Sequence, residues 1–259
     1  MEKTERIATI LSQIYGKQKG QEAFERIRSL IASYSKRSSP SAEVNLDQKE
    51  VVLITYGDSL RHAGQSPLQT LHTFTQRYLK QVISTIHFLP FFPFSSDDGF
   101  SVIDYMQIDP ALGSWDDVHK FTSDFRLMFD WVINHVSAKS PWFEAYLAGK
   151  PGYQALALEV DPDEDLSMVT RPRALPLLTP FEKKDGETVH LWTTFSDDQI
   201  DLNFKSIDVL VDMTLVMLAY VEHNAHILRL DAIAYLWKQI GTSCIHLPQT
   251  HLMVKLFRS

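Results

Sequence analysis

Cysteine is nearly absent from this chain, and long apolar runs are missing. Cys244 is the single cysteine among 259 residues, so no intramolecular disulfide forms and a reducing cytoplasm is the expected compartment. The most apolar run, residues 209–221, is interrupted by Asp212 and is too short to span a bilayer. The first six residues lead into no apolar core of the signal-peptide type. We therefore expect a cytoplasmic protein that neither spans a membrane nor is secreted.

An excess of positive charge is also lacking. The chain has 25 Lys and Arg residues against 32 Asp and Glu residues, which gives a formal net charge of -7. This balance argues against a nucleic-acid partner and against an anionic membrane surface. The sequence contains no phosphate-binding glycine loop, no Gly-x-Ser-x-Gly elbow and no His-Glu-x-x-His motif, and its ten histidines lack metal-ligand spacing. Those classes of enzyme therefore have no support.

The composition fits one ordinary globular unit with a sizeable core, because 44% of the residues are hydrophobic and 22% are charged. Residues 1 to about 34 carry apolar side chains at helical spacing and predict two amphipathic helices with a break near residues 16–20. The polar run at residues 35–41 predicts a linker. We expect this helical hairpin to pack on the main domain; a partner-binding module is the alternative.

Four short apolar runs predict four strands, at residues 51–55, 84–89, 127–133 and 226–230. Helical spacing between and after them predicts helices at residues 67–82, 115–125, 207–222 and 249–257. Strands that alternate with helices imply right-handed parallel units. The continuous apolar run of the first strand is typical of a strand that is covered on both faces.

Periodicity lapses between residues 137 and 205, where the sequence is rich in proline, aromatic and charged residues. A connection of this length inside a compact domain is expected to be functional or to form a small excursion domain, because long structureless loops are uncommon there. We therefore predict that this segment lies outside the four strands.

The fourth predicted strand ends in two charged side chains, Arg229 and Asp231. Because successive side chains of a strand alternate between its faces, both point to one side while Leu230 faces the other. A guanidinium beside a carboxylate lowers the pKa of the acid and fixes its rotamer, as a nucleophile requires. The same pattern also fits a structural ion pair, and from these residues alone both interpretations stay open.

Several motifs occur along the chain in the order found in one family. They are Phe91-Phe92-Pro93-Phe94, Asp97-Asp98-Gly99-Phe100, Leu112-Gly113-Ser114-Trp115-Asp116-Asp117, Asp130-Trp131-Val132-Ile133-Asn134-His135, Arg171-Pro172-Arg173, Arg229-Leu230-Asp231 and Gly241-Thr242-Ser243-Cys244. With them the chain resembles the retaining α-glucoside enzymes of the α-amylase family, and more closely the sucrose phosphorylase branch. Residues 95–105, 170–181 and 191–202 most closely resemble the glucosylglycerate phosphorylases. Ordered motifs of this length are far more specific than a single tripeptide.

This resemblance implies an α/β fold, the (β/α)8 TIM barrel of the α-amylase type, of which roughly the first half is present. The expected parts are as follows in chain order: residues 1–50 are an N-terminal helical extension and linker, 51–136 the first part of the catalytic barrel, 137–205 the excursion domain, and 206–259 the barrel continuation through the fourth strand.

The resemblance also assigns roles to charged and polar residues. Asp231 is the candidate nucleophile, and Arg229 positions it. Asp98 and His135 are expected to hydrogen-bond hydroxyls of the glucosyl ring, since a sugar needs fixed donors and acceptors to be oriented. For His135 taken alone, a structural histidine is the alternative.

Phe100 and Tyr235 are expected to form aromatic walls of the sugar pocket, with core packing as the alternative. We interpret Asp130 as mainly structural, bracing the end of its strand. Asn134 corresponds to a calcium ligand in many amylases, yet the phosphorylase branch generally lacks that ion. The resemblance therefore implies no metal and no cofactor, with inorganic phosphate as co-substrate.

The expected function is that of an α-glucoside phosphorylase, which moves glucose from glucosylglycerate to phosphate through a glucosyl-enzyme on Asp231 and gives α-glucose 1-phosphate and glycerate. Sucrose or sucrose 6-phosphate phosphorylase, and a non-catalytic remnant of a disrupted gene, are the alternatives. In the family the acid/base glutamate lies on the fifth strand and a stabilising aspartate after the seventh, and this sequence ends before either. We expect the chain alone to be inactive, and open barrel edges to promote self-association.

Overall fold

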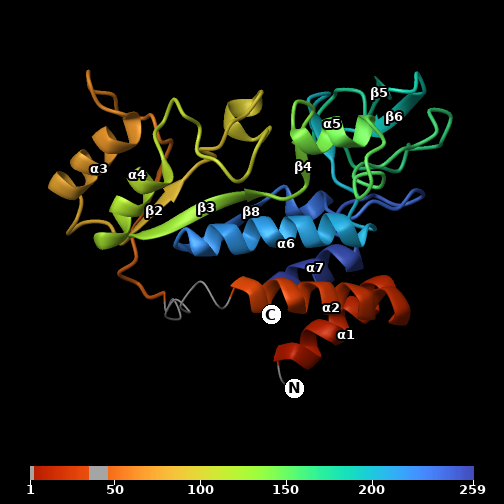
Figure 1. Ribbon diagram of the computed structural model, residues 1–259, viewed down its shortest axis with the longest axis horizontal. Helices are drawn as coiled ribbons and strands as arrows, with labels where there is room; N and C mark the ends of the chain where they lie inside the picture. The colour runs from red at the N-terminus through yellow and green to blue at the C-terminus, as the bar shows by residue number, and fades with distance from the viewer. Residues whose placement is uncertain (1–2, 35–45) are drawn as a thin grey trace. The chain divides into compact units, whose positions relative to one another are not determined.

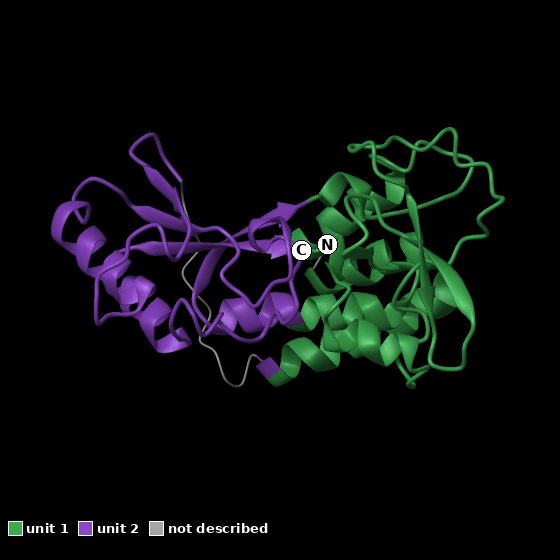
Figure 2. Cartoon of the chain, turned by 90° about the horizontal axis from the view of Figure 1, so that it is seen from above, with its two compact units in different colours: residues 1–33, 133–215, 232–259 green, residues 34–132, 216–231 purple. Residues whose placement is uncertain are grey.

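The chain divides into two units that alternate along the sequence (Figure 2). The computed structural model describes residues 3–34 and 46–259, so the linker predicted at residues 35–41 lies outside the described residues. Unit 1 comprises residues 1–33, 133–215 and 232–259, and unit 2 comprises residues 34–132 and 216–231. These units cut the chain at other places than the expected domains, whose boundaries stay a prediction.

Unit 2 contains the four predicted strands in one parallel sheet, in the order β1-β2-β3-β8 (Figure 1). The strands are β1 (Val52–Thr55), β2 (Thr85–Phe88), β3 (Arg126–Val132) and β8 (Ala225–Asp231). Each pairs in parallel with its neighbours, and the register places Asp130 opposite Arg229 and Val132 opposite Asp231. The prediction that the four strands are adjacent and parallel is therefore confirmed.

Helices connect these strands at the predicted places. They are α3 (Pro67–Tyr78), α4 (Trp115–Lys120) continued by the 3-10 turn η2 (Phe121–Ser123), and α6 (Ile207–Glu222), which leads into β8. The start of α3 follows from Ser66, whose side chain accepts a hydrogen bond from the backbone N–H of Gln69. At the start of α4 the backbone N–H of Ser114 donates to the Asp117 carboxylate at 3.2 Å, as in a capping box.

The aromatic residues of the loop after β2 pack into the core of unit 2. Phe91 and Phe92 are each 1% exposed. The ring of Phe91 lies edge-on against Phe129 of β3, with centroids 4.9 Å apart, and Phe92 stacks on Tyr220 of α6 at 5.1 Å. These contacts anchor the start of the loop that carries Asp98.

The expectation that the first strand is covered on both faces is wrong. Val52 is 45% exposed and Ile54 is 61% exposed. Val52 and Ile54 alternate with Leu53 and Thr55 along β1, so the face that they share meets solvent. Among the described residues β1 is also an edge strand that pairs with β2 alone. An apolar run shows that a strand suits burial on both faces, but the covering elements come from elsewhere in the fold.

Unit 1 begins with a helical hairpin of α1 (Lys3–Tyr15) and α2 (Lys17–Tyr34). The break between them is confined to Gly16, whose φ is +80°, and is narrower than the predicted break because Gly20 lies inside α2. A Cβ atom at Gly20 would lie 2.7 Å from the Cα of Ser12, so the two helices approach each other closely there. Helix α1 also packs on α7 (Pro248–Arg258).

The segment from 137 to 205 has secondary structure of its own, so the expectation that it is not a structureless loop is confirmed. It contains α5 (Pro141–Leu147) and two antiparallel pairs, which are β4 (His135–Ser137) with β7 (Gln199–Asp201) and β5 (Leu178–Glu182) with β6 (Thr188–Trp192). A small core of Val169, Leu177, Trp192 and Cys244 ties the segment to the C-terminal part of unit 1. Across the part of the chain that the structure describes, none of the helices is both long and apolar enough to cross a bilayer.

Candidate functional site

The carboxylate of Asp130 joins three strands of the sheet in unit 2. Its side chain is fully buried on β3. The His87 ring on β2 lies 2.8 Å from it through Nε2, and the guanidinium of Arg229 on β8 forms an ion pair with it. Hydrogen bonds to charged groups are stronger than neutral ones, and this carboxylate is shielded from water. The structure therefore agrees with the interpretation of Asp130 as a brace at the strand ends.

Arg229 connects that brace to the candidate nucleophile. One of its nitrogens, Nη1, lies 3.3 Å from Oδ1 of Asp231, and both side chains are on the same side of β8, as predicted. Burial lowers the pKa of Arg229, but the hydrogen bond that it donates to Asp130 and the charges of Asp130 and Asp231 outweigh this effect and raise the pKa above its ordinary value. The guanidinium is thus a permanent charge, held by a buried carboxylate and directed at a more accessible one.

Asp231 occupies the carboxyl end of its strand, where parallel α/β barrels place their catalytic groups. Its side chain is 18% exposed, so a ligand can reach it. The next residue, Ala232, turns the chain with a left-handed φ of +50°. Tyr105 also lies near: its hydroxyl donates to the backbone carbonyl of Val132 at 3.0 Å, and burial together with the charge of Asp231 raises its pKa. No local pattern around Tyr105 predicts that this residue lies close to Asp231.

Asp98 and Phe100 lie on the loop after β2, within unit 2. The turn η1 (Asp97–Gly99) has positive φ at all three positions, and a Cβ at Gly99 would lie 3.0 Å from Pro90. Non-glycine residues in this conformation are costly and concentrate at functional sites. Asp98 is exposed, whereas Phe100 is half-buried with its ring 5.8 Å from the guanidinium carbon of Arg229. The structure thus brings Phe100 to Arg229, and the sugar-binding role of Asp98 stays a prediction.

In unit 1, His135 begins β4 and is 1% exposed. The side-chain amide of Gln199 on β7 lies 3.0 Å from its Nε2, and the amide of Asn134 lies 3.4 Å from its Nδ1. The imidazole is thereby fixed by its neighbours in the antiparallel pair β4 and β7. This environment is compatible with a sugar-binding histidine and with a structural one, so the sugar-binding role of His135 stays a prediction.

Phe195 joins two of the predicted site residues. Its ring centroid lies 5.3 Å from that of His135 and 5.4 Å from that of Tyr235, which it meets edge-on. Phe195 and Tyr235 are both half-buried, so each keeps an accessible ring surface, as a sugar-facing wall requires. Sequence reasoning missed Phe195, because an aromatic residue in a segment without periodicity carries no signal of its own.

A buried ammonium ion lies next to these residues. Lys238 is 3% exposed, and its Nζ lies 2.8 Å from Oδ1 of Asn134 and 2.5 Å from Oδ2 of Asp201. The amide of Asn134 also donates to Asp201 at 3.0 Å. Burial lowers the pKa of Lys238, which the charge of Asp201 opposes. We call Lys238, Asn134 and Asp201 the Lys238 network.

The expectation that no metal is bound stays a prediction, and the Lys238 network contains Asn134, the residue on which it rests. The side-chain oxygen of Asn134, which corresponds to a calcium ligand in many amylases, accepts a hydrogen bond from a protein cation here. Within residues 3–34 and 46–259, no group of three or more His, Cys, Asp and Glu side chains is arranged to hold a metal ion. The available sequence signal for this network was Lys238, which directly follows the apolar residues Leu236 and Trp237. A lysine beside core residues is almost never fully buried unless it is paired, so it predicts a carboxylate partner.

The predicted site residues are divided between the two units. Unit 2 brings together Asp231, Arg229 and Phe100, and unit 1 brings together His135 and Tyr235. Along the chain, His135 follows the last residue of β3 by three positions, and Tyr235 follows Asp231 by four.

Comparison with known proteins gives a consistent result. The family model described as "Alpha amylase, catalytic domain" matches residues 62–254. The glucosylglycerate phosphorylase of Spirochaeta thermophila is 49% identical over 265 residues, which cover 100% of this chain and 45% of that protein. The glucosylglycerate phosphorylase of Escherichia coli is 47% identical and aligns with 98% of this chain and 46% of its own length.

Among solved structures, sucrose 6F-phosphate phosphorylase from Thermoanaerobacter thermosaccharolyticum has a TM-score of 0.75 and 32% sequence identity. That similarity covers 83% of this chain and 46% of the other. The chain thus spans about half the length of the curated relatives it matches.

Proposed function

Because this chain belongs to the α-amylase family, we propose that it carries the nucleophile of a retaining α-glucoside phosphorylase that transfers glucose from glucosylglycerate to inorganic phosphate. The observation that carries this proposal is the 49% identity along the whole chain to the glucosylglycerate phosphorylase of Spirochaeta thermophila. The 32% identity to a sucrose 6F-phosphate phosphorylase favours that substrate less. The whole protein's substrates are part of the proposal, since the chain spans about half of these relatives.

The proposed reaction proceeds by two displacements at the anomeric carbon. The carboxylate of Asp231 attacks this carbon, the glycosidic C–O bond breaks, and the departing glycerate oxygen takes a proton from a general acid. An oxygen of inorganic phosphate then attacks the same carbon and releases Asp231 as the leaving group. Two inversions give net retention, with α-glucose 1-phosphate and glycerate as products.

The arrangement around Asp231 supports its role as nucleophile. A nucleophilic carboxylate must be ionised and held in one orientation. Arg229 meets both needs, because its guanidinium is anchored on the buried Asp130 and lies 3.3 Å from Asp231. In the second step the same positive charge lies beside the carboxylate of Asp231 as this carboxylate leaves and phosphate takes the glucosyl group.

The other residues of the site would bind the glucosyl ring. We propose that Asp98 and His135 exchange hydrogen bonds with its hydroxyls, and that the rings of Phe100, Tyr235 and Phe195 contact its apolar faces. The half-buried state of these rings supports this role, since a wall of a pocket needs accessible ring surface. No metal or cofactor takes part in the proposed chemistry, and the ammonium of Lys238 supplies the cation beside Asn134.

The test is a fusion of this chain, after Ser259, to the remaining portion of the Spirochaeta thermophila relative. We expect release of glucose 1-phosphate from glucosylglycerate in phosphate buffer, and loss of that release in Asp231→Asn, which keeps the shape but removes the charge of the nucleophile. The matched control is Asp163→Asn, an exposed carboxylate of the excursion segment, and it should keep full turnover.

Three further arms sharpen the result. Sucrose in place of glucosylglycerate tests the substrate, water in place of phosphate tests the acceptor, and the unfused chain tests what the 259 residues do alone. Undiminished turnover by the Asp231→Asn fusion would rule out Asp231 as the nucleophile. Faster turnover of sucrose than of glucosylglycerate would replace the proposed substrate.

A further inference from the structure

The N-terminal hairpin contacts the segments that hold the Lys238 network, all within unit 1. Tyr15 is the last residue of α1, and its hydroxyl donates to the backbone carbonyl of Phe204 at 2.8 Å. The Tyr15 ring also meets Trp237 edge-on, with centroids 6.2 Å apart. Burial raises the pKa of Tyr15, so its hydroxyl remains a donor throughout the usual pH range.

The second helix of the hairpin has a contact of its own. Arg26 of α2 lies 2.7 Å from the carboxylate of Asp208 in the first turn of α6. Both side chains are more than a third exposed, so this ion pair contributes little by itself. The buried faces of the hairpin, including Leu11 and Ala23, are already used for packing. This favours a hairpin that belongs to the fold over a module whose apolar face awaits a partner.

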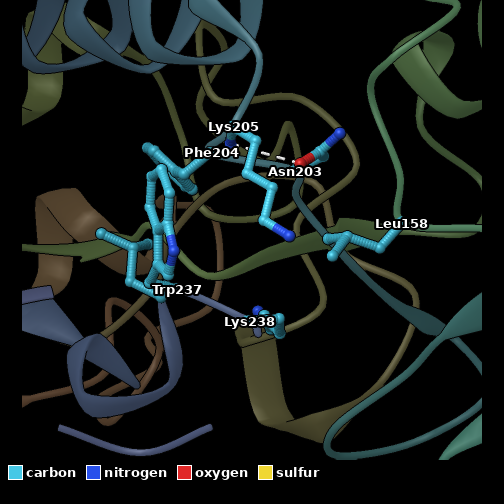
Figure 3. Close-up of a pocket in the computed structure, with 7 residues that line it drawn as sticks. Leu158, Asn203, Phe204, Lys205, Trp237 and Lys238 are labelled. Atoms are coloured by element: carbon cyan, nitrogen blue, oxygen red, sulfur yellow. Dashed lines mark hydrogen bonds between the residues drawn. The ribbon is translucent and has the colours of Figure 1, made fainter. Parts of the chain in front are cut away.

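Figure 3 shows Phe204 and Trp237, the two residues that Tyr15 contacts, beside Lys238. Phe204, Trp237 and Lys238 line a narrow hollow that has no room for a sugar. It is a junction of packed side chains, in which displacement of one wall is transmitted to the others.

The two residues that Tyr15 contacts are close in sequence to the charged pair of the Lys238 network. Phe204 follows Asp201 by three positions, and Trp237 directly precedes Lys238. Lys238 holds Asn134, and Asn134 adjoins His135. An unbroken series of contacts therefore leads from the hairpin to the imidazole.

We propose that Tyr15 is a positioning residue, which holds Phe204 and Trp237 in place and through them sets the Lys238 network and the orientation of His135. The N-terminal hairpin is then a part of the sugar-site scaffold. This inference rests on the proposed function for the meaning of His135, but its geometry is testable without turnover.

The experiment compares Tyr15→Phe with Tyr146→Phe in the 259-residue chain. Tyr146 is a matched control, because its hydroxyl is also part-buried in unit 1 and donates to Glu159 at 2.6 Å, away from the Lys238 network. Each variant loses one hydroxyl and should lower the melting temperature by about 2–4 °C. The deciding signal is the pair of imidazole ¹⁵N resonances of His135, assigned by their disappearance in His135→Gln.

We expect Tyr15→Phe to shift the His135 resonances and Tyr146→Phe to leave them unchanged. In the fusion with the relative, Tyr15→Phe should raise KM for glucosylglycerate more than it lowers kcat, since it loosens a sugar contact and leaves Asp231 in place. Unchanged His135 resonances in Tyr15→Phe, with a fall in melting temperature like that of Tyr146→Phe, would reduce Tyr15 to a stabilising residue and overturn the inference. Absence of turnover in the unsubstituted fusion would instead count against the proposed function, while the resonances would still decide the positioning role.

Discussion

Replacing Lys238 by methionine removes the buried cation and leaves its partners in place. Lys238 is 3% exposed, and the side chain of Asp201, 2.5 Å from its Nζ, is fully buried. Breaking a buried ion pair by removing one partner typically costs about 3–5 kcal/mol, because the remaining charge is left without compensation. Asp201 keeps hydrogen bonds from Asn134 and from the backbone and hydroxyl of Thr194, so we expect a loss near the lower end, about 3 kcal/mol.

Urea denaturation of the chain measures this loss as a lower transition midpoint. The matched control is Lys183→Met, because Lys183 is also an ion-paired lysine, but its two partners Glu159 and Glu187 are 43% and 60% exposed. Such pairs are worth about 0.2–1 kcal/mol. The double variant Lys238→Met/Asp201→Asn should recover part of the loss, since it no longer buries an unpaired charge.

Two results would refute this reasoning. A loss in Lys238→Met no greater than that in Lys183→Met would show that the buried ammonium does not stabilise unit 1. Equal losses in Lys238→Met and in the double variant would show that the unpaired charge of Asp201 is not the cause.

Burial, together with the charge of Asp208, raises the pKa of Asp212 to about 6. The folded chain therefore binds this proton more tightly than the unfolded chain does. The resulting stability is fully present below about pH 4 and is lost as the pH rises through 6. Asp212→Asn should therefore raise the free energy of unfolding by up to about 3 kcal/mol at pH 8 relative to its effect at pH 4, and equal effects in urea titrations at both pH values would contradict this. Ile54, 61% exposed on the edge strand β1, should promote self-association, so Ile54→Lys should shift sedimentation toward smaller species; an unchanged distribution would place the association elsewhere.

The sequence by itself determined the four strands of the parallel sheet and the helices between them, in their order along the chain. Helix α6 spans the predicted residues 207–222, and β3 differs from its prediction by one residue at each end. Such segments can be predicted because the spacing of their apolar side chains is complete within a short stretch of chain. The same holds for Arg229 and Asp231, whose shared face follows from the alternation of side chains along one strand.

The partners of those side chains were decided by the tertiary structure. The pairing of Arg229 with Asp130 depends on the register of β3 against β8, which no local pattern of either strand contains. The exposed face of β1 likewise depends on which elements lie over the sheet, although its apolar sequence suits burial on both faces.

The Lys238 network was also set by the tertiary structure alone. Asp201 lies 67 positions after Asn134, and Lys238 lies 104 positions after Asn134. Each of the three therefore looks unremarkable in its own segment. Only the folding of three distant segments of unit 1 against one another places a lysine and an aspartate in the same water-excluded space. Burial makes a charge costly until an opposite charge is fixed beside it, and that requirement becomes visible only when both positions are known.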